Sequence, residues 1–158
     1  MPLLPQRDKN GDVVPHDHQE ILPEHGVIRR ISEQYLVADD KCPVLRVSSM
    51  AFQASSGLNG GMSVDLQHEI EKAGLDAMQY VTTPIWIGAV RFLASQLREE
   101  GLMVGADPIE NKPGGKLDVE PNPYHGEVWG KFTKGKQNRL IMLCEWFVPI
   151  NGVSLSCK

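Results

Sequence analysis

The stretch that decides the predicted fold is residues 83–101, TPIWIGAVRFLASQLREEG. Its large apolar residues recur at the spacing of one helix face: Trp86, Val90, Leu93 and Leu97. Thr83 suits the N-cap, Pro84 suits the first helical position, and Gly101 follows the last periodic residue as helix-ending glycines do. The stretch therefore predicts one long central helix from Pro84 to Glu100.

Segments with strand character lie on both sides of this helix. Alternating or β-branched patterns predict short strands at residues 26–31, 44–48, 62–64, 102–104 and 124–131. A shorter helix is expected from an N-cap at Asp65 to Gly74. Residues 138–148 favour a C-terminal helix by composition, whereas the turn residues 134–136 before them fit a hairpin strand equally well. The expected fold class is α+β: a small sheet packed by the long central helix and the C-terminal helix.

The chain is expected to form one domain with an arm before it. A length of 158 residues with 41% hydrophobic and 23% charged residues is ordinary for a single globular domain. Residues 1–24 contain four prolines and predict an extended N-terminal arm, residues 25–150 the domain, and residues 151–158 a C-terminal tail. Residues 109–123, with three prolines and a Pro-Gly-Gly turn, predict an exposed insertion loop.

The sequence also bears on where the protein is located. The apolar runs are far shorter than the ~20 residues of a membrane-spanning helix, and the N-terminus lacks the apolar core of a secretory signal. Cys42, Cys144 and Cys157 form no Cys-x-x-Cys pair, which is typical of a reduced protein without a zinc or redox motif. A cytoplasmic protein without membrane contact is expected.

Charge is distributed unevenly along the chain. The net charge is −4, yet residues 111–158 carry 7 basic and 4 acidic side chains. A basic patch is expected from four residues close in sequence: Lys131, Lys134, Lys136 and Arg139. Such a patch suits phosphate or an acidic partner. Nucleic acid is not the favoured partner, because the whole chain is acidic, and a solvated surface is the simpler interpretation.

His125 and Glu127 are the candidate catalytic residues. They lie two positions apart in a predicted strand and therefore on one face of it. A carboxylate that orients a histidine gives the general base that proton transfer needs near neutral pH. The alternative is that both side chains simply line the solvent face of an edge strand.

A candidate ligand-binding group lies beside a glycine-rich loop. Arg46, Ser48, Ser49 and Ser63 flank residues 57–61 and offer a guanidinium and hydroxyls to a phosphate or carboxylate. The loop lacks the spacing of a nucleotide-triphosphate motif. His16, Asp17, His18 and His25 are metal-ligand types, but they lie in the arm and predict no metal site. No cofactor is expected.

Two resemblances add to these patterns. The segments 48–52 (SSMAF), 60–64 (GGMSV), 107–108 (DP) and 122–125 (NPYH) resemble a group of uncharacterised small bacterial α+β proteins with Ser-Ser-x-Ala-Phe, Met-Ser-Val, Asp-Pro and Pro-x-His segments. This resemblance covers residues 26 to about 148. It implies a domain extent and a bacterial cytoplasmic setting, but no activity.

The second resemblance is at the level of the fold. ADP-ribosyl-transferring folds hold and cleave a nicotinamide nucleotide with an arginine strand, a serine-bearing strand and a late glutamate, in that order. Arg46, Ser48 and Glu127 occur in a similar order in this chain. The aromatic residue that clamps the nicotinamide and the strict serine motif of those folds are not placed by the sequence.

Two classes of function follow. The first is an accessory protein that binds another bacterial or phage protein, in a defence or mobile-element context, through the arm and the 109–123 loop. The alternative is a small enzyme acting on a nucleotide or phosphorylated substrate, ADP-ribosyltransferase-like in its chemistry, with His125 as base, Glu127 orienting it and Arg46 binding the anion.

Overall fold

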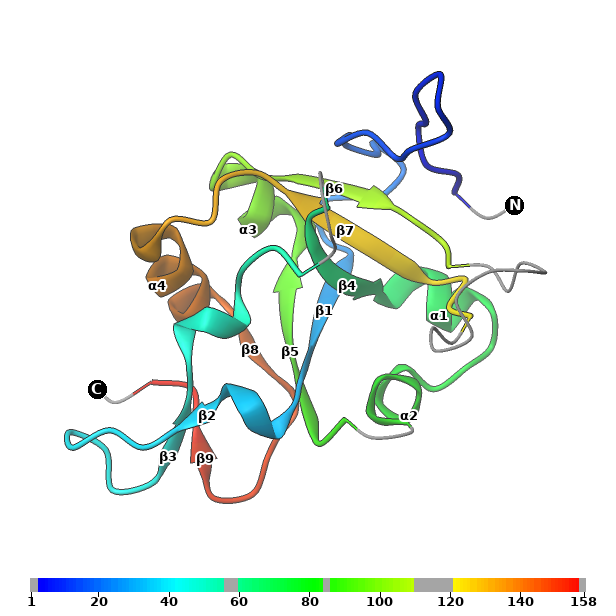
Figure 1. The fold of residues 1–158 in the computed structure, drawn as a ribbon. Coiled ribbons are helices and arrows are strands. Elements are labelled where there is room, and N and C mark those ends of the chain that lie inside the picture. The colour runs from blue at the N-terminus through cyan, green and yellow to red at the C-terminus, as the bar shows by residue number, and fades with distance from the viewer. Residues whose placement is uncertain (1–2, 56–59, 84–85, 110–120, 157–158) are drawn as a thin grey trace.

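A computed structural model describes residues 3–55, 60–83, 86–109 and 121–156. Its main element is a six-stranded antiparallel sheet in the order β6-β7-β4-β1-β5-β8 (Figure 1). The strands are β1 (Gly26–Ile31), β4 (Met62–Leu66), β5 (Gly88–Leu93), β6 (Met103–Ala106), β7 (His125–Trp129) and β8 (Glu145–Val148). A second sheet, in the order β2-β3-β9, joins β2 (Leu36–Val37), β3 (Leu45–Val47) and β9 (Val153–Ser154).

Four α-helices of the described residues cover both faces of the large sheet: α1 (Gln67–Lys72), α2 (Ala77–Thr82), α3 (Ala94–Glu99) and α4 (Lys134–Leu143). Two single turns, η1 (Glu33–Tyr35) and η2 (Ser49–Ala51), flank the small sheet. The mixed α and β class expected from the sequence is confirmed. α1 and α2 cover a small core around Ile28, Ile70 and Val81, and α3 and α4 cover a larger one on the other face.

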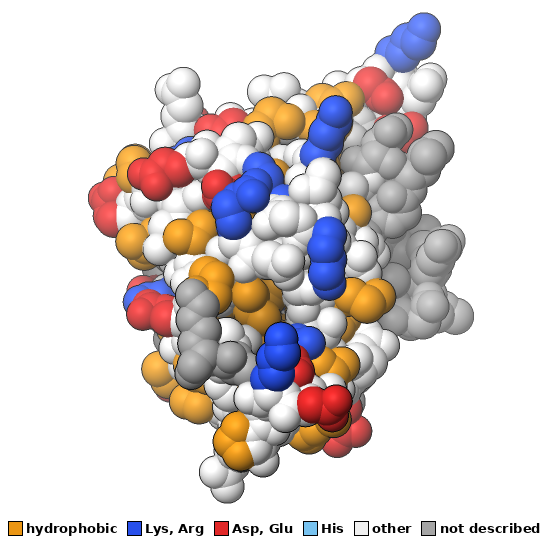
Figure 2. All heavy atoms as spheres, turned by 90° about the vertical axis from the view of Figure 1, so that its left-hand side faces the viewer, with side chains coloured by type: hydrophobic (Ala, Val, Ile, Leu, Met, Phe, Trp, Pro, Cys, Tyr) orange, Lys and Arg blue, Asp and Glu red, His pale blue; other side chains and the backbone are white. Residues whose placement is uncertain are grey.

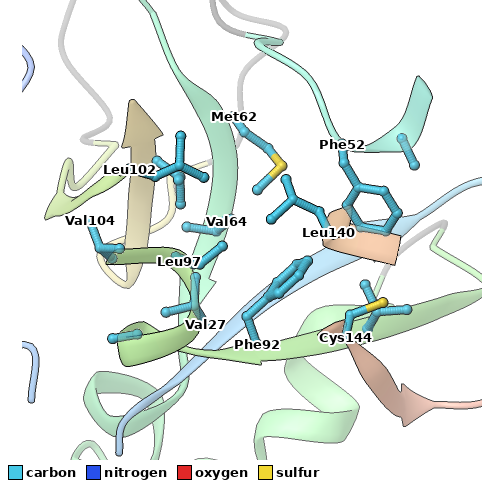
Figure 3. Close-up of a cluster of buried hydrophobic side chains, with 14 of the residues drawn as sticks. Val27, Phe52, Met62, Val64, Phe92, Leu97, Leu102, Val104, Leu140 and Cys144 are labelled. Atoms are coloured by element: carbon cyan, nitrogen blue, oxygen red, sulfur yellow. The ribbon is translucent and has the colours of Figure 1, made fainter. Parts of the chain in front are cut away.

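The larger core joins distant segments of the chain. Figure 3 shows Phe52, which follows η2, directed toward Phe92 of β5 and Leu140 of α4. The Phe52 and Phe92 rings meet edge to face with centroids 5.7 Å apart, a favoured aromatic geometry. Burial of these side chains on one face of the large sheet holds β5 against α4 and the segment that follows η2.

The prediction of one long helix from Pro84 to Glu100 is wrong. Residues 88–93 form β5, only residues 94–99 form a helix, and residues 84–85 lie outside the described residues. β5 lies between β1 and β8, with Ala89 in one core and Phe92 in the other. A strand that is buried on both faces has a nearly continuous apolar sequence, so it lacks the alternation of polar and apolar residues that marks a strand. Apolar residues in such a run also match the spacing of one helix face, which led to the helix prediction.

Two other expected boundaries are also corrected. Residues 138–148, expected as one helix, are the end of α4 followed by β8, so each of the two alternatives holds for part of the stretch. α4 begins four residues earlier than expected, because the Thr133 side chain caps it by accepting from the Lys136 amide. Asp65 is not an N-cap: it belongs to β4, and α1 starts at Gln67.

A strand and a helix at residues 88–93 predict opposite effects of a substitution at Gly88 on stability. A Cβ atom at Gly88 would lie 2.8 Å from the Val148 carbonyl oxygen and 2.3 Å from Ile150 Cγ1. We therefore expect Gly88→Ala to destabilise the protein by about 1–3 kcal/mol through overpacking, measured by chemical denaturation. In an exposed helix the same change would stabilise by about 1 kcal/mol, and that sign would contradict the strand.

Cysteine chemistry differs from the expectation of fully reduced thiols. Cys42 is disulfide-bonded, whereas Cys144 is free and buried at the end of α4. Burial raises the pKa of the Cys144 thiol to about 12, which suits the buried apolar role that its sequence context indicates. Among the described residues, no helix combines the length and apolar character required to cross a bilayer.

Candidate functional site

The candidate site is a cavity of about 880 Å³ where β1 and β4 separate. β1 pairs with β5 over six residues, but with β4 only at Val27–Leu66 and Ile28–Asp65. The two strands therefore diverge after Ile28, and the cavity opens at this point. Its wall combines charged, hydroxyl and aromatic side chains, chiefly Arg29, Arg30, Ser63, Asp65, His125, Tyr35, Tyr80 and Trp86.

Arg29 is the buried cation of this cavity. The residue lines the cavity and is 5% exposed. Nε donates to the Ala51 carbonyl at 2.9 Å and Nη1 to the Ser63 carbonyl at 2.8 Å. Longer contacts join Nη1 to Ser55 Oγ at 3.4 Å and Nη2 to the Tyr35 hydroxyl at 3.3 Å. Burial lowers the pKa of the Arg29 guanidinium, opposed by nearby Tyr35 and by the carboxylates of Glu127 and Asp65.

Within the described residues, no carboxylate lies within 4.0 Å of the Arg29 guanidinium nitrogens. All four acceptors that it contacts are uncharged. A buried charge is costly unless an opposite charge pairs with it. The arrangement therefore favours an anion in the cavity.

Arg30, by contrast, is already neutralised. Its Nε and Nη2 donate to the two oxygens of Asp65 at 2.7 and 3.1 Å. Asp65 also accepts from Asn122 Nδ2 at 2.8 Å, and Asn122 Oδ1 accepts from the Tyr80 hydroxyl at 2.7 Å. Burial, and then Asp65, raise the pKa of Tyr80 to about 12, so this phenol stays protonated. The network joins β1, β4, α2 and Asn122 along one wall of the cavity.

His125 and Glu127 are brought together on β7, as the spacing predicts. Strand pairing sets Glu127 opposite Ser63 and His125 opposite Asp65, so these four residues share one face of the sheet. His125 Nδ1 lies 2.6 Å from the Asp107 carbonyl oxygen, which only accepts, and therefore carries a proton. Nε2 lies 3.7 Å from Glu127 Oε1 and is the nitrogen left to exchange a proton.

These two side chains are not on a solvent-facing strand. His125 is 7% and Glu127 3% exposed, and β7 lies between β6 and β4. His125 lines the cavity. Glu127 Oε2 accepts from the Gly61 amide at 2.9 Å, which anchors the carboxylate beside the strand that carries Ser63. The alternative of an exposed edge strand is therefore wrong.

Asp107, His125 and Glu127 also form a group whose ligand-type atoms lie within 4.8 Å of one another. Among the described residues, these three are close enough together to hold a metal ion. Glu127, however, already accepts the Gly61 amide and lies in the field of the Arg29 guanidinium. A divalent cation would be repelled by that guanidinium, and we assign no metal here.

The other predicted ligand residues lie apart from one another. Ser63 lines the cavity, but Arg46 lies in the small sheet, where its Nε donates to Asp39 at 2.8 Å. Ser48 caps η2 by accepting from the Met50 amide, and Ser49 Oγ accepts from Lys134 Nζ at 2.7 Å. Among these four residues, only Ser63 is in the lining of the cavity.

The four basic residues of the expected patch do not form a free cationic surface. Lys134 binds Ser49, Lys136 donates to the Glu100 carbonyl, and Arg139 Nε lies 2.6 Å from Glu100 Oε1. Figure 2, which faces the side where α4 lies, shows basic side chains separated by acidic and uncharged ones. Lys131 is exposed beyond the end of β7. The solvated-surface interpretation fits these contacts.

Sequence reasoning missed Arg29. Its signal was present, because residues 26–31 read as a strand that carries two consecutive arginines. Charged residues are seldom fully buried unless paired, so an arginine pair within an apolar strand indicates a specific use.

No family model, curated protein or solved structure matches the chain. The resemblance to small bacterial proteins therefore stays a prediction, and the site is interpreted from its own geometry.

Proposed function

We propose that the protein is an enzyme that acts on a nucleotide bound in the cavity between β1 and β4. Arg29 binds the anionic group, and His125, oriented by Asp107 and Glu127, transfers protons. The observation that carries the proposal is the buried guanidinium of Arg29, which lines the cavity and contacts only uncharged acceptors among the described residues.

The chemistry of Arg29 fits a phosphate. A guanidinium has five N–H donors in one plane, and the four contacts of Arg29 include two of 3.3 and 3.4 Å. Both weak contacts involve the terminal nitrogens, which a phosphate binds in a bidentate manner. A phosphate would also place a negative charge in direct contact with this buried cation, in addition to the more distant carboxylates of Glu127 and Asp65.

The remaining wall fits a base and a sugar. Tyr35, Tyr80 and Trp86 line the cavity, and aromatic rings are the surfaces on which nucleotide bases stack. Asp76, which also lines it, offers a carboxylate of the kind that accepts from ribose hydroxyls. The volume of about 880 Å³ lies in the range of small-molecule sites, roughly 300–1,000 Å³.

The reaction class comes from the resemblance to ADP-ribosyl-transferring folds. An arginine strand, a serine-bearing strand and a late glutamate are adjacent here as β1, β4 and β7, with Ser63 opposite Glu127. The sequence based this resemblance on Arg46, Ser48 and Glu127. Arg46 and Ser48 lie outside the cavity lining, so the proposal puts Arg29 and Ser63 in their places, with Tyr35 beside Arg29 as the aromatic clamp. Cleavage of the glycosidic C–N bond releases neutral nicotinamide and passes through a positively charged state, which a nearby carboxylate stabilises. A water molecule then forms the new C–O bond at the same carbon and gives its proton to His125.

The test uses the full-length protein with NAD⁺ and ADP-ribose. We expect both to bind in calorimetric titrations and nicotinamide to be released from NAD⁺, detected by chromatography. Binding of ADP-ribose without release of nicotinamide would retain a nucleotide site and reject the reaction class. Failure of both ligands to bind at millimolar concentration would contradict the proposal.

The geometry favours the accessory-protein hypothesis less. The arm residues expected to hold a partner contact the chain's own sheet, where the His18 amide donates to the Val104 carbonyl at 2.9 Å. Residues 110–120 of the expected insertion loop lie outside the described residues. Binding of another protein stays a prediction from the sequence.

A further inference from the structure

The N-terminal arm is attached along the outer edge of β6, the end strand of the large sheet. The Val104 amide donates to Asp17 Oδ1 at 2.9 Å, and the Ala106 amide donates to His18 Nδ1 at 2.9 Å. Arg98 in α3 holds the same segment, donating to Asp17 Oδ1 at 3.0 Å and to the His18 carbonyl at 2.7 Å. The arm thus satisfies backbone groups that a free edge strand would expose.

His16 is enclosed by this contact. It is 4% exposed, and its ring centroid lies 4.8 Å from a Trp129 ring centroid. A Cβ atom at position 105 would come within 2.6 Å of His16 Nε2, so glycine at that position allows the close approach. His16 Nδ1 lies 2.8 Å from the Val14 carbonyl, and Nε2 lies 3.2 Å from His18 Nδ1.

The hydrogen bonds of His18 leave no place for a second proton on its ring. His18 Nδ1 must accept from the Ala106 amide, while its Nε2 donates to the Leu4 carbonyl at 2.9 Å, so His18 is neutral. His16 donates from Nδ1 to the Val14 carbonyl, because a carbonyl oxygen only accepts. A proton on His18 Nδ1 would instead face the Ala106 N–H, and two imidazolium rings 4.5 Å apart would repel.

The next part of the arm is held by a second histidine pair. His25 Nδ1 accepts from the Leu22 amide at 3.0 Å, and its ring stacks on that of His68 in α1 with centroids 4.1 Å apart. Protonation of His25 would likewise remove an acceptor. Four of the five histidines of the chain therefore lie in two close pairs that fasten residues 16–25 to the domain.

We infer that the two histidine pairs form an acid-operated clasp, which holds the arm on β6 at neutral pH and releases it when His18 and His25 take up protons. This inference goes beyond the proposed function and does not depend on it. One consequence reaches the cavity: Ala106 precedes Asp107, whose carbonyl oxygen orients His125.

The direction of the pKa shifts agrees with this geometry. Burial, and then the charge of His16, lower the pKa of His18 below 6.5, while Leu4, Glu20 and Asp17 act in the opposite direction. Burial, and then His68, lower the pKa of His25, opposed by Glu24 and Glu69, with Arg98 adding to the lowering. Because the attached arm disfavours these protons, attachment is complete above the pKa of a free histidine and weakens as the pH falls below it.

The experiment measures amide exchange by NMR on the full-length protein between pH 7.5 and 5.0, corrected for intrinsic rates. We expect protection of the Val104 and Ala106 amides to fall about tenfold per pH unit below the free-histidine pKa for each proton taken up. The β1 and β5 core amides Val27 and Phe92 should keep their protection and report any global unfolding.

His18→Asn is the matched variant, because the asparagine side-chain oxygen replaces the Nδ1 acceptor without binding a proton. In this variant we expect the protection of Ala106 to depend less steeply on pH, by the part that His18 contributes, while residues 22–25 still respond through His25. Protection of Ala106 that is constant with pH in the unmodified protein would overturn the clasp. A fall that persists unchanged at Ala106 in His18→Asn, or that is shared by Val27 and Phe92, would overturn it equally.

Discussion

Arg29→Lys is expected to weaken ADP-ribose binding by about 10- to 150-fold, the equivalent of about 1.5–3 kcal/mol for hydrogen bonds to a charged group. Lysine keeps the positive charge but lacks the planar fork that binds a phosphate through two nitrogens. The loss should appear in calorimetric titration as a change in Kd rather than in stoichiometry.

The matched control is Arg46→Lys, the same substitution at the arginine that the sequence favoured. Arg46 pairs with Asp39 in the small sheet, and neither residue lines the cavity, so its replacement should leave Kd unchanged. Thermal unfolding of both variants checks their folding, since Arg29 also bridges the Ala51 and Ser63 carbonyls. Equal affinity in Arg29→Lys and the unmodified protein would remove the basis of the proposed site.

His125→Asn is expected to lower the rate of nicotinamide release by about 10²–10⁴-fold, the range of a general acid or base. Asparagine keeps a side-chain N–H donor for the Asp107 carbonyl and removes Nε2, the nitrogen assigned to proton transfer. The effect should fall on kcat, with KM little changed, because Arg29 still binds the anion. A variant with normal kcat would show that His125 only packs against the cavity.

Glu127→Gln tests whether Glu127 orients His125, separately from the proton transfer assigned to His125 itself. Glutamine retains an oxygen that accepts from the Gly61 amide but removes the negative charge near His125 Nε2. A positioning role therefore predicts a smaller loss of kcat than in His125→Asn and a displaced pH–rate profile. A profile identical to that of the unmodified protein would exclude the carboxylate from this role.

Local patterns predicted the strands well and the central helix wrongly. The strands near residues 26–31, 62–64 and 102–104 are confirmed as β1, β4 and β6, because each contains the alternation or β-branched residues of a strand. The prediction for residues 88–93 was wrong because both faces of β5 are buried. The close fit of Gly88 against Val148 and Ile150, which requires a strand here, involves residues 60 and 62 positions later.

The site was accessible to sequence reasoning only in part. His125, Glu127 and Ser63 were found because spacing within a strand determines which residues share a face. Arg29 was missed because its role depends on the divergence of β1 from β4, which follows from how the whole sheet pairs. Arg46 was chosen because it is close in sequence to the serines, and proximity along the chain does not determine proximity across two sheets.

The most direct measurement follows the arginine side chains by ¹⁵N NMR while ADP-ribose is added to the full-length protein. Resonances are assigned with the Arg29→Lys and Arg46→Lys variants. We expect the Nε–Hε signal of Arg29 to shift with saturation, as its guanidinium gains a phosphate, while the signal of Arg46 stays in place. A shift confined to Arg46, or no shift in either signal, would contradict the assignment of Arg29 as the anion-binding residue.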